Sequence, residues 1–143
     1  MSVKKPDRRE SKNEFDETYF KVYDEAVKLI EHNFGAKQKQ AERKGYIGYM
    51  ADGIMKSVTA MGTYIRIANS IYPQYEKELI ERRIAQEKAI GLCYDILTKY
   101  QLVMHELKVP DDKHVEEIKN LIHEINCLKA WRKSDNKRFK NLG

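Results

Sequence analysis

Basic side chains gather at the two ends of the sequence, and the chemistry they offer is the binding of phosphate groups. Residues 1–12 hold five lysines and arginines against two acidic residues, and the last fifteen residues hold six against one. Charge segregated in this way indicates a polyanionic partner, of which nucleic acid is the commonest. The alternative is that both ends only keep the chain soluble. The candidate nucleic-acid-binding residues at the ends are Lys4, Lys5, Arg8, Arg9, Arg132, Lys133, Lys137, Arg138 and Lys140.

Three arginines in the middle of the chain are further candidates for nucleic-acid binding. Glu78 stands one helical turn before Arg82, and Glu87 stands one turn after Arg83. This spacing favours local ion pairs on a solvated helix over a contact with phosphate or a second subunit. Arg66 lies in the mainly apolar stretch IRIAN, with few acidic neighbours in the sequence, which favours an interface or RNA contact.

The sequence offers no arrangement typical of a catalytic or metal centre. No histidine follows a glutamate at the E-x-x-H spacing of di-iron bundles, and HExxH, GxxxxGKS and the Arg–His spacing of small helical toxin ribonucleases are missing. Asp111 and His114 supply only two ligands, and Asp111 is better suited to cap a helix. Ser57 has no nearby base in the sequence. We therefore expect no enzyme activity, no metal and no cofactor, with all four histidines on solvated or boundary faces.

The composition places the chain among single-domain helical proteins. Its 143 residues are 41% hydrophobic, enough for one core, and 34% charged, with a formal net charge of +5. Seven glycines and three prolines are too few for a sandwich or barrel of many short turns. No apolar run approaches the length of a membrane span, the charged start MSVKKPDRRESK contains no secretory h-region, and Cys93 and Cys127 form no CxxC pair. We expect a cytoplasmic protein with reduced thiols.

Four stretches of helical periodicity alternate with breakers at Gly35, Pro73 and Pro110. The first follows a capping box from Ser11 to Glu14, and the last is preceded by aspartates suited to cap it. The apolar positions of the first helix are Phe15, Tyr19, Val22, Tyr23, Ala26, Val27, Ile30 and Phe34. Those of the second are Ile47, Met50, Ile54, Val58, Met61, Ile65, Ala68 and Tyr72. Those of the last are Val115, Ile118, Leu121, Ile122, Ile125 and Leu128, with Trp131 near its end.

The third helix, from about residue 74 to 107, carries two apolar stripes. The first consists of Leu79, Ala89, Cys93, Ile96, Tyr100, Val103 and Leu107, and the second of Ile80, Ile84, Ile90, Leu97 and Met104. So wide an apolar surface indicates burial on two sides and hence oligomerisation, or else a well-buried central helix. In the second helix, small residues at Gly53, Ser57 and Ala60 would let another helix approach closely.

Short connections predict an all-α fold, an antiparallel up-down-up-down four-helix bundle. Residues 1–12 then form a basic head, residues 13–132 the bundle and residues 133–143 a basic tail. In this topology the head and the tail meet at one pole. The tail loses the apolar periodicity, so Phe139 is expected either to stack on an unpaired base or to be exposed and mobile.

The sequence resembles a family of small bacterial proteins, the accessory variability determinants encoded beside reverse transcriptases in diversity-generating retroelements. The resemblance rests on the opening MSVKKPDRRESKNEF, the middle IRIANSIYP with ERRIAQEKAIGLCYDIL, and the ending LKAWRKSDNKRF. It covers nearly the whole chain, and the opening and the WRKSDNK ending are its most specific parts. The family is related in fold to the ribosomal RNA intervening-sequence proteins.

The resemblance implies a barrel-like homopentamer of four-helix bundles that is not itself an enzyme. Such a protein binds the reverse transcriptase and the template RNA of its element and supports mutagenic cDNA synthesis. The implied RNA contacts are the head and tail cations named above, with Arg66, Arg82 and Arg83 as possible additions. The competing interpretation, from another class, is a helical adaptor that binds other proteins through the wide apolar surface of its third helix; an enzyme ranks third.

Overall fold

The protein is built from helices. The computed structural model describes residues 14–34, 44–110 and 112–142, and 89% of these are helical, with no strand among them. The elements are α2 (Glu14–Lys28), which continues as the π-helical η1 (Leu29–Phe34), α4 (Lys44–Ser70), α5 (Glu76–Glu106), α6 (Val115–Arg138) and the short 3-10 helix η3 (Lys140–Leu142). The predicted all-helical fold with four long helices is thereby confirmed. Within the described ranges, none of the helices combines the length and apolar composition that a membrane span requires.

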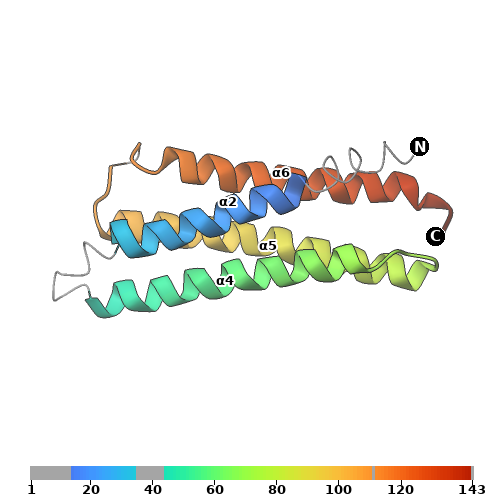
Figure 1. Cartoon of the computed structure of the whole chain (residues 1–143), viewed down its shortest axis with the longest axis horizontal. Coiled ribbons are helices and arrows are strands. Elements are labelled where there is room, and N and C mark those ends of the chain that lie inside the picture. The colour runs from blue at the N-terminus through green and yellow to red at the C-terminus, as the bar shows by residue number, and fades with distance from the viewer. Residues whose placement is uncertain (1–13, 35–43, 111, 143) are drawn as a thin grey trace.

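The helices lie lengthwise beside one another. In Figure 1, α2 and α5 run toward the left and α4 and α6 toward the right, and each helix contacts two others: α2 packs on α4 and α6, and α5 packs on α4 and α6. The ring of contacts leaves a single core between the helices. Helix α2 is shorter than α6 and begins beside its second half, where Phe15 stacks on Trp131 with ring centroids 4.0 Å apart.

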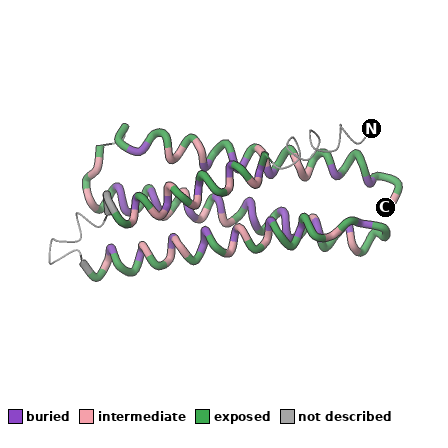
Figure 2. Tube along the Cα trace, in the orientation of Figure 1, coloured by how far each residue is buried: buried purple, intermediate pink, exposed green. Residues whose placement is uncertain are grey.

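The apolar repeat of α4 supplies the centre of this core. Ile47, Ile54, Val58 and Met61 are all buried, at the steps of three, four and seven residues that keep them on one helix face. Figure 2 shows how buried positions recur along the inward faces of the helices. The one predicted member outside the pattern is Tyr72, which lies beyond the end of α4 and is exposed.

The two apolar stripes predicted for α5 differ in how far the bundle buries them. The first is buried from Leu79 to Val103, with Leu107 partly buried. In the second, Ile90 and Met104 are buried, whereas Ile80 and Ile84 remain nearly half exposed. The bundle therefore covers only part of the wide apolar surface of α5.

A glycine sets how closely α2 approaches α4. A Cβ atom at Gly62 would collide with the phenol ring of Tyr19, whose hydroxyl donates a hydrogen bond of 3.0 Å to the carbonyl of Val58. Gly53 instead faces the side chain of Lys99 on α5. The small-residue face of α4 thus serves contacts inside the bundle.

Two local predictions need correction. Helix α6 begins after His114, which makes no side-chain cap hydrogen bond, so Asp112 does not cap it, and Asp111 is outside the described residues. His114 is also buried rather than solvated, whereas His105 and His123 are exposed as expected. The predicted Ser11 cap and the Gly35 stop lie outside the described residues.

Candidate nucleic-acid interface

The end of α6 is helical and is not the irregular tail that the sequence predicts. The helix continues to Arg138, six residues beyond the predicted boundary at 132, and Asp135 and Phe139 are buried at 1% and 6% exposure. These two residues follow Trp131 at steps of four, so they extend the inward face of the helix. The predicted division at residues 132 and 133 is therefore wrong as a structural boundary, because a buried aspartate interrupts the apolar pattern without interrupting the helix.

Arg82 is the reason that Asp135 can be buried. The Arg82 Nε lies 2.6 Å from one carboxylate oxygen of Asp135, and its Nη2 lies 3.1 Å from the other. The remaining nitrogen, Nη1, donates to the carbonyl of Ile71 at 2.7 Å, where the chain leaves α4. With 5% exposure, Arg82 is a core residue. Both interpretations of Arg82 from the sequence were wrong: it is neither a phosphate contact nor paired with Glu78, which instead accepts a hydrogen bond from the backbone of Gln74.

Aromatic rings enclose the guanidinium of Arg82. It lies 5.1 Å from the ring centroid of Trp131 and 5.8 Å from that of Phe139, within the range of cation–π contacts. Phe139 in turn packs edge-on against Tyr72. Phe139 is therefore neither a stacking platform for a base nor an exposed side chain, and the predicted roles for it were wrong.

Other candidate cations of this region are held by local partners. Arg83 donates a 2.6 Å hydrogen bond to Asn136 of α6, and Arg132 lies 3.7 Å from a carboxylate oxygen of Glu87 on α5. The predicted Arg83–Glu87 pairing is thus replaced by contacts between α5 and α6. Both arginines are half-buried, so each keeps part of its guanidinium accessible.

Four cations at the end of the chain remain exposed. They are Lys133, Lys137, Arg138 and Lys140. Lys133 and Lys137 lie one turn apart on the same face of α6, whereas Arg138 lies over the ring of Phe139 at 5.0 Å. In the described ranges none of the four has an ion-pair partner. They are the side chains best placed to meet phosphates.

A shallow hollow lies beside these cations. It has a volume of about 220 Å³ and is formed by the start of α5 and the end of α6. Arg83 and Lys140 line it, together with Asn136 and the acidic Glu76. Its lining thus offers two cations and an amide at the place where the sequence predicts nucleic-acid contacts.

The remaining candidates lie elsewhere or outside the described residues. Arg66 is exposed on α4 and acts on Asp16 of α2: burial raises the pKa of the Asp16 carboxyl, and the charge of Arg66 partly opposes this. Arg66 therefore has an acidic neighbour that the sequence did not reveal. Lys4, Lys5, Arg8 and Arg9 fall in the undescribed residues 1–13, and so does the predicted meeting of head and tail.

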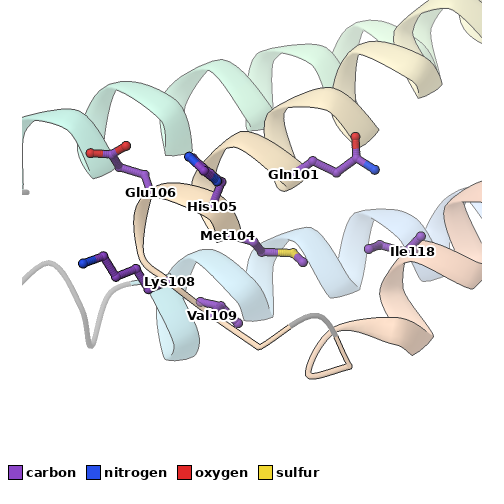
Figure 3. Close-up of a pocket in the computed structure, with 7 residues that line it drawn as sticks. All are labelled: Gln101, Met104, His105, Glu106, Lys108, Val109 and Ile118. Carbon is purple, nitrogen blue, oxygen red and sulfur yellow. The ribbon is translucent and has the colours of Figure 1, made fainter.

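A larger hollow at the other end of the bundle offers no such arrangement. It measures about 640 Å³ and is lined by the last turn of α5, the following residues and Ile118 of α6. In Figure 3 the side chains of Gln101, Glu106 and Lys108 point in different directions rather than toward a common point. The polar groups of this hollow do not converge on a ligand.

A serine, an aspartate and a lysine meet between α4 and α5, although the sequence showed no base near Ser57. Its hydroxyl donates to Asp95 at 2.5 Å, and the Lys99 ammonium donates to both side chains, at 2.9 and 2.6 Å. Burial would raise the pKa of Asp95, but the hydrogen bonds from Lys99 and Ser57 hold it below its ordinary value. Lys99 is paired as a cation, so the arrangement joins two helices and offers no free base to activate the hydroxyl.

The fold places the protein in the class of all-α proteins with four long helices. No family model, no curated protein and no solved structure matches the chain.

Proposed function

We propose that this chain is a non-catalytic accessory protein that binds a reverse transcriptase and its template RNA in a diversity-generating retroelement. In this proposal it acts in the cytoplasm as a barrel-like homopentamer of antiparallel up-down-up-down bundles and supports mutagenic cDNA synthesis. The proposal rests on the sequence resemblance, and the helical architecture is compatible with it.

The observation that carries the RNA-binding part is the group of exposed cations Lys133, Lys137, Arg138 and Lys140. Lysines and arginines bind phosphates without reading bases, so the RNA contact is expected to discriminate little between sequences and to weaken steeply with salt. Specificity would then come from the reverse transcriptase or from the fold of the RNA. Arg83 and Lys140 in the neighbouring hollow extend the surface onto α5.

The test replaces the four exposed cations with glutamine and measures the affinity for the template RNA at several salt concentrations. If all four contact phosphates, the slope of log affinity against log salt becomes shallower by up to about 3 units, since each phosphate contributes roughly 0.7 on a single strand. A matched control removes four exposed lysines away from this surface, namely Lys21, Lys28, Lys56 and Lys113. Arg82 and Arg132 stay unchanged, because Arg82 is a core residue and Arg132 is ion-paired.

Equal effects of the two variants would mean that total charge alone governs binding. If the variant that lacks the four exposed cations keeps the parent affinity for the template RNA and the parent salt slope, the assignment of RNA binding to this surface is overturned. Circular dichroism of both variants checks that the helices persist.

The second candidate function is a protein-binding adaptor. The observation that favours it is the row of exposed apolar side chains on α5, which includes Ile80 and Ile84. Copurification with the reverse transcriptase in the absence of RNA would support either proposal. Binding of RNA by the isolated chain distinguishes the accessory protein from an adaptor.

A further inference from the structure

A glutamate, a histidine and a cysteine from two helices meet beside the start of α2. Glu14 is the first residue of α2, and His123 and Cys127 lie one turn apart on the same face of α6. The Nε2 atom of His123 is 3.1 Å from Oε2 of Glu14 and 3.5 Å from Sγ of Cys127. One donor atom from each residue lies within 4.8 Å of the other two. Three donors of different chemistry thus converge on one point.

The distances suit a tetrahedral metal ion. Zinc binds oxygen, nitrogen and sulfur ligands at about 2.0–2.3 Å, so ligand atoms at tetrahedral angles are roughly 3.3–3.6 Å apart. The two observed separations, 3.1 and 3.5 Å, are close to these edges. The third separation, between Glu14 and Cys127, is at most 4.8 Å, so the exposed Glu14 side chain has to move toward the sulfur to complete the triangle.

The donor set selects the class of ion. Calcium and magnesium take oxygen ligands, whereas imidazole, thiolate and carboxylate together are the ligands of zinc. Three protein ligands leave the fourth position of a tetrahedral ion to water. His123 and Glu14 are more than half exposed, so an ion reaches the cluster directly from solvent.

The surroundings add one observation that fits the role of Cys127 as a ligand. The hydroxyl of Thr18, a buried residue, hydrogen-bonds with the Cys127 sulfur and so holds it as an outer ligand partner would.

We propose that Glu14, His123 and Cys127 form a binding site for Zn²⁺ that joins the start of α2 to α6. The ion fastens α2 to α6 next to the stacked pair Phe15 and Trp131. It therefore fixes the position of the first turn of α2. The site revises the expectation of no metal, and it stands independently of the proposed function.

The test is titration of the untagged, chelator-treated full chain with zinc chloride by isothermal calorimetry. We expect one ion per chain at micromolar affinity. Cobalt chloride should produce the near-ultraviolet charge-transfer band of a cobalt–thiolate bond, which reports Cys127 directly. Glu14→Gln, His123→Asn and Cys127→Ser should each weaken binding at least tenfold, because loss of an outer partner alone costs about 10–100-fold. Cys127→Ser should also abolish the charge-transfer band.

The matched controls remove a cysteine and a histidine outside the cluster. Cys93→Ala and His105→Asn leave all three ligands in place, so both should bind zinc as the parent chain does. Absence of binding at micromolar zinc would overturn the proposal and leave Glu14 and His123 as a plain ion pair. Binding that survives all three ligand variants would overturn it as well. Circular dichroism establishes that each variant is folded before its affinity is compared.

Discussion

Arg82 of α5 and Asp135 of α6 form a buried ion pair with two hydrogen bonds across 53 residues of sequence. Gln86 donates a third bond to the same carboxylate at 2.7 Å. Both side chains are almost fully buried. The satisfied geometry of the pair explains why α6 continues as a helix through a segment whose composition resembles a tail.

The first prediction concerns the loss of this pair. Asp135→Ala should lower the free energy of unfolding by about 3–5 kcal/mol, because Arg82 is left buried without a counter-charge. Urea unfolding followed by circular dichroism measures the change. Replacing both partners, as Arg82→Met with Asp135→Leu, should cost less than the single change. Glu116→Ala, an exposed acid on the same helix, should stay within about 0.5 kcal/mol of the parent. A loss for Asp135→Ala as small as that of the control would contradict the structure.

The close approach of α2 and α4 gives the second prediction. Gly62→Ala should destabilise the protein by about 1–3 kcal/mol, because the added methyl group collides with the ring of Tyr19. Gly91→Ala, at a helical glycine with open space around it, should instead stabilise by about 0.5–1 kcal/mol. Tyr19→Phe removes the atom nearest to the added methyl and should recover part of the loss in the double variant. Equal thermal stabilities of the two alanine variants would refute the steric argument.

The buried faces that the sequence predicted correctly are those defined by the apolar periodicity within a single helix. The stripe of α4 from Ile47 to Ala68 was predictable because every member is apolar and because the bundle buries the face that the periodicity defines. The same holds for Val22 and Ala26 in α2 and for Leu121 and Leu128 in α6. Local periodicity determines the buried face of a helix regardless of which partner covers it.

The features that were missed depend on pairing across the fold. Arg82 looked solvated because its true partner, Asp135, lies far away in the sequence and a glutamate stands one turn before it. The spacing of His123 and Cys127 was visible in the sequence, but Glu14 lies 109 residues from His123, and only the packing of α2 on α6 brings it there. A buried charge leaves no mark in a hydrophobicity pattern, so these contacts needed the structure.

Glu124 has an environment that favours its protonated form. Burial, with smaller contributions from Asp16 and Glu14 of α2, raises the pKa of Glu124 to about 9. Tyr19 of α2 and the thiols of Cys93 and Cys127 are the other titratable groups that it acts on. Among the described residues, no cation belongs to the charges that act on Glu124. The folded chain therefore keeps a proton that the unfolded chain releases above its ordinary pKa of 4.5.

The third prediction follows from this proton. The stability contributed by protonated Glu124 is fully present below pH 4.5 and is lost as the pH rises toward 9, because the unfolded state then binds fewer protons. Glu124→Gln carries no ionisable group, so its stability relative to the parent should rise by about 3 kcal/mol between roughly pH 5 and pH 7. Denaturant unfolding in the presence of a chelator measures this difference without bound metal. Parallel stability profiles of the two proteins would show that Glu124 is ionised in the fold.

The last prediction concerns the apolar surface that the bundle leaves uncovered. Ile80, Ile84, Tyr94 and Leu102 share one face of α5 and are each between 45% and 51% exposed. Glu87 and Thr98 interrupt the row. Exposed apolar side chains gathered on one helix face are nevertheless typical of a surface that another protein covers.

We expect these side chains to be buried in contacts between copies of the chain. The expected assembly is a pentamer. Light scattering at micromolar concentration should then give about five times the chain mass of 16.9 kDa. Ile84→Lys places a charge in the middle of the row and should shift the particle toward smaller species, because an unpaired charge is costly to bury. Ile122→Lys makes the same change at an isoleucine of α6 with 44% exposure and should leave the mass unchanged. A parent chain that is monomeric at this concentration would rule out self-association through α5 and favour an adaptor that binds a different protein with this face.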